Sequence, residues 1–394
     1  MKFVVAGAGI GGLCSALALS RCGVDVDVIE RSPQISEVGA GLQLSPNAMK
    51  VIRALGVEDA VAAKSCRPDA LELRLGKSGR TVFSIPMGDE AVRRYGAAYL
   101  HVHRADVIDA LRAAVEDAGV RIRLGTEVAS YAQDGDTVSI GLDTGEVVVA
   151  DGLVGADGLK SAVRKRMFGP EAPLFTGAVA WRILSPANVA PDLPNGAVVW
   201  AGRRQHAVTY RIRNGALINF VGVVEDPSWR IESWHEPGDP EALMKRFAGW
   251  TDPLRRVIAA AEVCNRWALF DRNPLPEWSR GRVTLLGDAC HPMPPFQAQG
   301  AAMAIEDAFV LSRCLVADAG NPVAALRRYE TIRRPRTTRM LQSARDNMDV
   351  FHRSNALTQL ATYGPMRLAN SLAPAFVRSR QDWIYSHDVA QEPL

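Results

Sequence analysis

The sequence of 394 residues has no C-x-x-C pair among its six cysteines, and its seven histidines show no H-E-x-x-H or other metal-ligand spacing. Zinc knuckles, redox dithiols and metal centres are therefore not predicted. Most of the cysteines are expected to be small buried residues. Cys290 is expected to pack in the interior rather than to act as a nucleophile.

The chain also lacks a strong net charge and a long apolar run. Its 46 basic and 43 acidic residues leave a net charge of +3, too small to argue for a nucleic-acid or anionic-membrane partner. The basic cluster Arg333–Arg336 is expected to be a solvated helix boundary. No apolar run approaches the ~20 residues that cross a bilayer, and the first residues do not have the form of a signal peptide. These features predict a cytoplasmic protein.

What the chain does have is a glycine-rich turn near its start, between a short buried strand and a helix. The pattern runs through Lys2–Ala6, Gly7-Ala8-Gly9-Ile10-Gly11-Gly12, Leu13–Arg21 and the strand Val24–Ile29. Gly7 permits a tight turn, Gly9 lets the backbone approach a pyrophosphate, and Gly12 allows close packing of helix on strand. Glu30 follows Gly12 by 18 residues, near the ~20 expected for an acid that accepts ribose hydroxyls. The unit predicts a dinucleotide site, against the alternative of a simple turn with Glu30 exposed.

A second informative stretch lies near residue 290. A strand-like segment from Val283 to Leu286 is followed by Asp288, a proline-rich loop and a helix that opens at Gly300. Unpaired backbone N–H groups and the positive end of the helix dipole would face whatever lies before Gly300. This arrangement suits a cofactor with a hydroxylated chain at one end and developing negative charge at the other.

The remaining sequence changes character along its length. Short β-like runs with Gly and Pro turns between Thr176 and Asn219 indicate an inserted antiparallel sheet, and the chain is mostly helical after Glu306. We expect an α/β fold with a discontinuous, Rossmann-like cofactor domain of residues 1–70, 100–172 and 279–345. A mostly antiparallel β-sheet substrate domain would comprise residues 71–99 and 173–278, and residues 346–394 would form a C-terminal helical segment.

Four motifs in this order resemble the FAD-dependent, single-component (group A) aromatic-ring hydroxylases. They are Gly7–Gly12 with Glu30, His103-Arg104, Asp151–Gly158 and Gly287–Gly300. The chain is most similar to the 3-hydroxybenzoate 6-hydroxylases, salicylate hydroxylases and 6-hydroxynicotinate 3-monooxygenases, which Arg272–Ser279 and Tyr95–Tyr99 also match. The resemblance covers nearly the whole chain. It implies an FAD domain of the glutathione-reductase type, like that of hydroxybenzoate hydroxylase.

The resemblance assigns FAD contacts to residues of all these motifs. They are Gly7, Gly9 and Gly12 at the pyrophosphate, Glu30 at the adenosine ribose with its neighbour Arg31, Arg104 at the phosphates or ribityl side, Val128 beside the adenine, Asp157 at the cofactor and in pyridine-nucleotide handling, Asp288 at the ribityl chain, and Gly300 and Ala301 under the flavin N1/O2 edge.

Four residues are implied on the substrate side. The carbonyl of Pro295 would face the substrate hydroxyl. Gln43 stands where the 3-hydroxybenzoate 6-hydroxylases have a glutamine and the 6-hydroxynicotinate enzymes a histidine. His206 and Tyr210 lie four residues apart on a predicted strand, and therefore on one face. The resemblance points this pair at the substrate, whereas the residues alone favour a hydrogen-bonded pair in a sheet core.

Neighbouring positions leave further alternatives open. For Trp181-Arg182 two interpretations are equally supported. The pair could belong to the site, or it could be ordinary sheet packing with an arginine at the surface. Phe296, Trp200 and Phe220 are expected to form apolar walls that exclude water.

The resemblance implies an FAD-dependent monooxygenase that hydroxylates a small aromatic hydroxy acid or phenol, with or without decarboxylation, in aromatic compound catabolism. It would use bound FAD, O2 and NADH or NADPH as a transient co-substrate, through a flavin C4a-hydroperoxide. A homodimer is compatible with it, since similar enzymes commonly form dimers. The alternatives are a same-fold epoxidase or antibiotic hydroxylase, a non-catalytic protein of the Rab GDP-dissociation-inhibitor kind, and a nicotinamide-only dehydrogenase.

Overall fold

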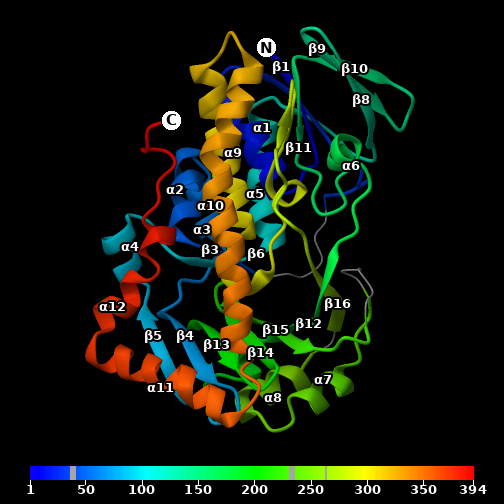
Figure 1. Ribbon diagram of the computed structural model, residues 1–394. Coiled ribbons are helices and arrows are strands. Elements are labelled where there is room, and N and C mark those ends of the chain that lie inside the picture. The colour runs from blue at the N-terminus through cyan, green and yellow to red at the C-terminus, as the bar shows by residue number, and fades with distance from the viewer. Residues whose placement is uncertain (36–40, 230–235, 262–263) are drawn as a thin grey trace.

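A long helix links two large β-sheets. In Figure 1 a six-stranded sheet lies toward the top and a seven-stranded sheet toward the bottom, and α10 (Pro322–Phe351) runs from one to the other. The computed structural model describes residues 1–35, 41–229, 236–261 and 264–394. The two sheets confirm the predicted α/β fold with an inserted, mostly antiparallel sheet.

The six-stranded sheet carries the glycine-rich turn at the end of its central strand. Its order is β17 (Ser279–Arg280), β18 (Val283–Leu285), β11 (Gly152–Gly155), β1 (Lys2–Ala6), β2 (Asp25–Ile29) and β7 (Arg121–Arg123). All neighbours are parallel except β17 and β18. The apolar run of β1 is buried, as a parallel strand covered on both faces requires. Segments from the start, middle and last third of the chain therefore meet at one sheet edge.

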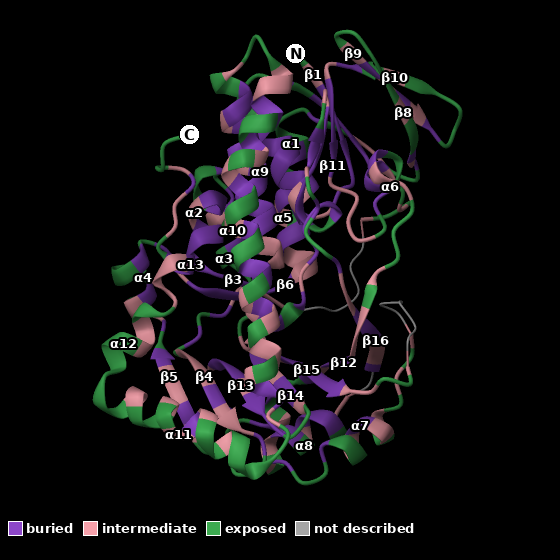
Figure 2. Ribbon diagram, in the orientation of Figure 1, coloured by how far each residue is buried: buried purple, intermediate pink, exposed green. Residues whose placement is uncertain are grey.

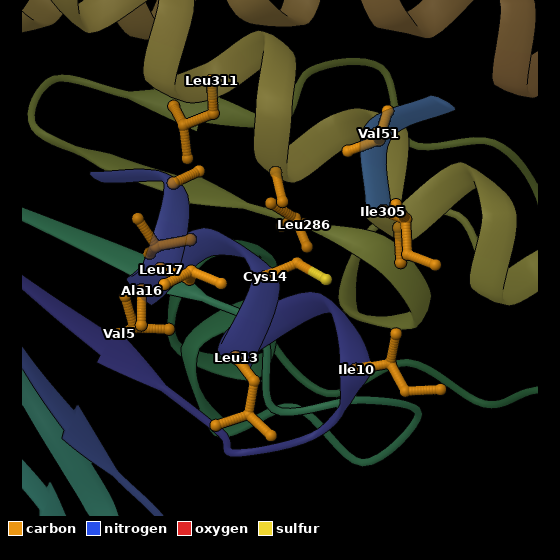
Figure 3. Close-up of a cluster of buried hydrophobic side chains, with 14 of the residues drawn as sticks. Val5, Ile10, Leu13, Cys14, Ala16, Leu17, Val51, Leu286, Ile305 and Leu311 are labelled. Carbon is orange, nitrogen blue, oxygen red and sulfur yellow. The ribbon is translucent and has the colours of Figure 1, made fainter. Parts of the chain in front are cut away.

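Helix α1 (Ile10–Arg21) packs on this sheet, and α5 (Arg104–Asp117) and α9 (Gly300–Ala317) pack on α1. Figure 3 shows how the buried side chains of α1 meet those of α9 and the loop before it, among them Leu13, Cys14, Leu17, Leu286, Ile305 and Leu311. Because α9 packs on α1, the N-termini of these two helices are fixed relative to each other.

Smaller elements surround this core. They are the helices α2 (Pro46–Ala54), α3 (Glu58–Ala62), α4 (Asp89–Tyr95) and α6 (Ala162–Phe168), the antiparallel ribbon β8 (Val128–Asp134), β9 (Thr137–Leu142) and β10 (Val147–Ala150), and the pair β3 (Gly41–Leu44) and β6 (Leu100–His103). Three 3-10 turns, Ala187–Val189, Gly287–Ala289 and Pro295–Gln297, complete the connections.

The seven-stranded sheet presents one face toward the start of α9 and the other toward two helices. Its order is β16 (Cys264–Asp271), β12 (Leu174–Pro186), β15 (Leu217–Glu225), β14 (Gln205–Ile212), β13 (Gly196–Ala201), β4 (Ala70–Leu75) and β5 (Thr81–Pro86), and only β13 and β4 are parallel neighbours. Helices α7 (Pro240–Arg246) and α8 (Asp252–Ala259) contribute to an apolar cluster on the far face. Because side chains alternate along a strand, each residue points either toward the start of α9 or toward the cluster with α7 and α8.

The C-terminal part is helical, as predicted: α10 is followed by α11 (Ala356–Leu372), α12 (Pro374–Ser379) and α13 (Asp382–Tyr385). Figure 2 shows much exposed surface on α11 and α12, whereas β1 and β11 of the six-stranded sheet are largely buried. The domain boundaries given above stay a prediction. In the described part of the chain, no helix is both long and apolar enough to cross a membrane.

The expectation for Arg333–Arg336 is wrong. These residues lie inside α10 rather than at a helix boundary, and Arg333 is 1% exposed. Arg333 is buried because it meets two acidic residues of α9, Glu306 and Asp307.

Candidate active site

A cleft runs from the glycine-rich turn to the seven-stranded sheet. It consists of two cavities of about 310 and 290 Å³, which share Gly9, Ala156 and Gly158 in their linings. The first cavity lies at the carboxyl ends of β1 and β2, and the second reaches from the start of α9 to β14. Their common lining makes one elongated site.

The glycine turn has the geometry that a pyrophosphate needs. Gly7 has a φ of +103°, and a Cβ there would lie 2.5 Å from the carbonyl oxygen of Ala156. A Cβ on Gly12 would lie 1.9 Å from the carbonyl oxygen of Gly7, so the turn closes only around glycine. Around Gly9 a Cβ would meet nothing within 4 Å, and this N-cap of α1 makes no side-chain capping bond. The backbone therefore stays open to an anion at the helix start.

The first cavity brings together several residues predicted to contact the adenosine. Glu30 lines it and bridges two loops, since its carboxylate accepts from the backbone N–H of Ala8 at 2.7 Å and of Ser32 at 2.8 Å. Arg31 and Val128 line the same cavity. Their place in one lining agrees with the predicted roles, which stay predictions.

Asp157 also lines this cavity, but one oxygen of its carboxylate is already hydrogen-bonded to the backbone. Its Oδ2 accepts from the backbone N–H of Ala162 at 2.7 Å and of Val163 at 3.2 Å, at the start of α6. Burial raises its pKa, and the hydrogen bonds oppose that shift. Asp157 therefore fixes the loop between β11 and α6 whatever else it contacts.

The second cavity brings Asp288, Arg104, Gly300 and Ala301 into one lining. Asp288 is exposed in this cavity, and the positive charge of Arg104 acts on its carboxylate. The N-cap of α9, Gln299, gives its helix no side-chain capping bond, and its amide oxygen accepts from Asn47 Nδ2 at 3.2 Å instead. The positive end of α9 therefore opens into the cavity beside Asp288.

A buried ionic network holds α9 from behind. Arg333 Nη1 lies 2.7 Å from Glu306, Arg333 Nε lies 2.7 Å from Asp307, and Arg336 Nε lies 2.8 Å from Glu306. Asp307 also pairs with His291 at 2.5 Å and accepts from the backbone N–H of Gly287 at 3.3 Å. Burial alone would raise the pKa of Glu306, but the two arginines hold it at about 2. The network ties α9 and α10 to the Asp288 loop.

The opposite wall of the second cavity is one face of β14. His206, Val208 and Tyr210 all line the cavity, as the predicted even spacing requires. Gln43 lines it too, and its Oε1 accepts from the hydroxyl of Tyr99 at 2.7 Å. All four predicted substrate-side residues thus meet at this end of the cleft, since Pro295 is also in the lining.

The Pro295 carbonyl is partly engaged within its own turn. It accepts a hydrogen bond from the backbone N–H of Ala298 at 3.3 Å. A carbonyl oxygen has a second lone pair for a substrate hydroxyl, so the predicted contact stays available.

The apolar walls differ from the expectation. Phe296 lines the cavity, but Trp200 and Phe220 were wrongly predicted, because both point to the far face of the sheet toward α7 and α8. Trp200 Nε1 donates there to Thr209 Oγ1 at 2.9 Å. The same alternation of side chains settles where Trp181 and Arg182 lie. Trp181 packs in the far-face cluster, whereas its neighbour Arg182 lines the cavity. The walls that the sequence reasoning missed are Val208, Val221, Val223 and Trp267.

His206 has a partner that sequence reasoning missed. Its Nδ1 lies 2.7 Å from Nε2 of His352, the residue that directly follows α10. His352 Nδ1 in turn lies 3.1 Å from the Glu225 carboxylate. Burial lowers the pKa of His206 well below its usual value, and the nearby His352 adds to the shift. No local spacing signals this contact, because 146 residues separate the two histidines.

These features fit a bound FAD. Two uncapped helix starts, a turn that only glycine can form, and an acid beside a basic residue follow one another along the cleft. Anionic groups are favoured at helix N-termini, and FAD presents a pyrophosphate and an electron-accepting ring at two such points.

Comparisons with known proteins agree with this geometry. Residues 1–344 match a protein family described as an FAD binding domain. The chain is 36% identical over 398 residues to a 6-hydroxynicotinate 3-monooxygenase of Bordetella bronchiseptica, covering 100% of this chain and 97% of the relative. It is 35% identical over 364 residues to a 3-hydroxybenzoate 6-hydroxylase of Klebsiella oxytoca, covering 91% of each. Its fold is similar to that of Klebsiella pneumoniae HpxO complexed with FAD and uric acid, with a TM-score of 0.86, 29% identity and coverage of 98% and 97%.

Proposed function

Since the chain belongs to the family of this FAD binding domain, we propose that it is an FAD-dependent monooxygenase that hydroxylates a small aromatic hydroxy acid. It takes electrons from NADH or NADPH and one oxygen atom from O2. The observation that carries the proposal is the cleft itself, which joins the glycine turn to the His206–Tyr210 face of β14. When bound there, FAD supplies dioxygen activation and oxygen transfer.

The chain's own residues hold and orient this cofactor. Glu30 and the turn around Gly9 suit the adenosine and pyrophosphate, and Arg104 and Asp288 suit the chain that leads to the flavin ring. The first amides of α9, at Gly300 and Ala301, would favour negative charge on a flavin ring bound in this cavity. The buried network behind α9 keeps these amides in position.

His206 is proposed as the base for the substrate hydroxyl. Its depressed pKa keeps the imidazole neutral near pH 7, so that a ring nitrogen can accept a proton. Loss of that proton raises electron density on the aromatic ring, which is the partner that attacks. Tyr210, two positions beyond Val208 on the same strand face, is proposed to orient the substrate. A positioned base of this kind contributes ~10²–10⁴ in rate.

The lining also supports an acidic substrate. Arg182 and Arg104 bring positive charge to the second cavity, and Phe296, Val221 and Trp267 bring apolar surface. A flat aromatic ring with a carboxylate and a hydroxyl matches this lining, because the carboxylate suits the positive charge and the ring suits the apolar surface. Both relatives named above act, by their names, on hydroxylated aromatic acids, and Gln43 at its position favours the 3-hydroxybenzoate type. A homodimer is part of the proposal on the resemblance alone, and a cytoplasmic location is part of it as well.

The test is oxidation of NADH with salicylate, 3-hydroxybenzoate, 4-hydroxybenzoate and 6-hydroxynicotinate, with mass spectrometry of each product. We expect at least one acid to stimulate NADH oxidation and to gain a hydroxyl. If none does, while an epoxidase or antibiotic-type substrate reacts, the substrate class proposed here is wrong.

The role of His206 is tested by His206→Ala. FAD binding and NADH oxidation should persist, while product per NADH should fall by about 10²-fold or more as peroxide is released instead. Thr209→Ser is the matched control, because Thr209 is on the same strand and points to the opposite face. An unchanged product yield in His206→Ala would exclude His206 as the base.

A further inference from the structure

A chain of three side chains leads from the substrate cavity to the protein surface. His206 is 1% exposed and His352 is 6% exposed, whereas the side chain of Glu225 is 24% exposed. The distances along the chain are 2.7 Å from His206 Nδ1 to His352 Nε2 and 3.1 Å from His352 Nδ1 to Glu225 Oε1. Glu225 also accepts from Arg204 Nε at 2.7 Å, and the side chain of Arg204 is 62% exposed. The chain therefore ends in solvent.

The carboxylate sets the direction of every hydrogen bond in this chain. An ionised Glu225 can only accept, so His352 Nδ1 must carry the proton that faces it. The Nε2 of neutral His352 then accepts, and His206 Nδ1 must donate to it. This leaves His206 Nε2 with a lone pair, and among the described residues this atom makes no hydrogen bond. Through His352, the carboxylate of Glu225 near the surface thus leaves His206 Nε2 free to accept a proton in the cavity.

We propose that His206, His352 and Glu225 form a proton relay that moves the substrate hydroxyl proton from the cavity to solvent, a role that rests on the proposed function. The substrate O–H bond breaks as His206 Nε2 takes the proton. His206 Nδ1 then gives its proton to His352 Nε2, and His352 Nδ1 gives its proton to Glu225, which exchanges it with water. One proton leaves the substrate and one reaches solvent, and each imidazole ends neutral, with its proton now on Nε2.

The surroundings explain why a buried base needs such a path. The ring of His206 packs against Phe296 and Phe351, with centroids 5.4 and 5.2 Å away, and among the described residues no acidic side chain acts on His206 to compensate a proton that stays there. The charged groups that act on His352 are Glu225 on β15, Asp349 on α10 and Arg204 in the loop before β14. The two acids favour a proton on His352 and Arg204 opposes it. Passing the proton outward therefore moves positive charge from an apolar site to an acidic one.

A purely structural role for this chain predicts something different. If His352 and Glu225 only hold the ring of His206 in place, any side chain at position 225 that still accepts a hydrogen bond from His352 Nδ1 should support the same rate of product formation. Glu225→Gln is such a change, because the amide oxygen can still accept from His352 Nδ1 but cannot carry the proton away. His352→Phe breaks the path with a ring of similar shape.

The first readout requires no turnover. In the flavin-loaded protein, nitrogen-15 NMR of the histidine rings should show both His206 and His352 protonated on Nδ1, in wild type and in Glu225→Gln. A proton on Nε2 of either ring in the resting enzyme would overturn the assigned direction of the relay.

The second readout is the pH dependence of product formation with the best acid of the panel. We expect Glu225→Gln and His352→Phe to form product about 10- to 100-fold more slowly near pH 7. The defect should shrink as the pH rises, because a substrate that binds already ionised needs no relay. Glu72→Gln is the control, since Glu72 also pairs with an arginine on this sheet, Arg74 at 2.7 Å, and lies outside the cavity lining.

The outcomes separate the two proposals. Wild-type turnover in Glu225→Gln, or a loss that stays constant with pH, would overturn the relay and leave the hydroxylase intact. If the wild-type protein hydroxylates no acid at all, the proposed function fails, and the ring protonation still reports on the hydrogen-bond chain.

Discussion

Replacing Arg333 by Met should destabilise the protein strongly, although Arg333 contacts neither of the two cavities described above. The side chain is 1% exposed and is the shared partner of Glu306 and Asp307, both 0% exposed. Removing one partner of a buried pair costs about 3–5 kcal/mol, because the remaining charge stays buried without compensation. Arg336 still faces Glu306 and His291 still faces Asp307, so the lower part of this range is expected.

The pKa of Glu306 gives a second, independent value for the stability that this ionic network contributes. Its ordinary value of 4.5 is lowered to about 2, which corresponds to ~3 kcal/mol of stability at neutral pH. Because the pKa is depressed, this stability is present above pH 4.5 and is lost as the pH falls toward 2. The difference in unfolding free energy between wild type and Arg333→Met should therefore be largest near pH 7 and shrink on acidification.

The assay is thermal unfolding followed by circular dichroism at several pH values, with FAD at saturation. With ~2 cal/mol/K of unfolding entropy per residue, a loss of ~3 kcal/mol lowers Tm by about 4 °C in a chain of this length. Arg334→Met is the control, since the side chain of Arg334 is 45% exposed and its ion pair with Glu330 is worth ~0–1 kcal/mol. Equal Tm losses in the two variants, or a difference that grows as the pH falls, would refute the reasoning.

Three further changes test the cleft. Asp288→Ala should yield protein that purifies nearly colourless, because the acid beside the start of α9 is lost; full yellow colour by absorbance would remove this residue from the cofactor site. Gly12→Ala should abolish flavin binding, since its Cβ would lie 1.9 Å from the Gly7 carbonyl oxygen, and flavin retention in a fluorescence titration would contradict the tight turn. Trp200→Phe should cost ~1 kcal/mol of stability through its lost hydrogen bond to Thr209 and leave KM unchanged, whereas a raised KM would return Trp200 to the cavity wall.

The sequence was most informative where function depends on the backbone. The turn at Gly7 and Gly12 admits no side chain, so its chemistry is visible in the residue types themselves. The strand–loop–helix passage around Asp288 and Gly300 was predictable for the same reason. Family membership, predicted from these motifs, is confirmed over residues 1–344.

Contacts between distant side chains were not predictable. Trp200 and Phe220 were misplaced because aromatic residues suit both faces of a sheet, and only the register of β13, β14 and β15 decides which face each one takes. Arg333 was misread because a basic run on a long helix looks solvated until its acidic partners are known. The contact of His352 with His206 depends on how far α10 reaches, which no motif encodes.

The most direct test of the central claim is mass spectrometry of the product formed under isotopically labelled dioxygen. Purified protein with FAD, NADH and the best aromatic acid of the panel should yield a hydroxylated product that carries one labelled oxygen atom. A product whose new oxygen comes from water, or NADH oxidation that releases only peroxide with every acid tested, would contradict the account.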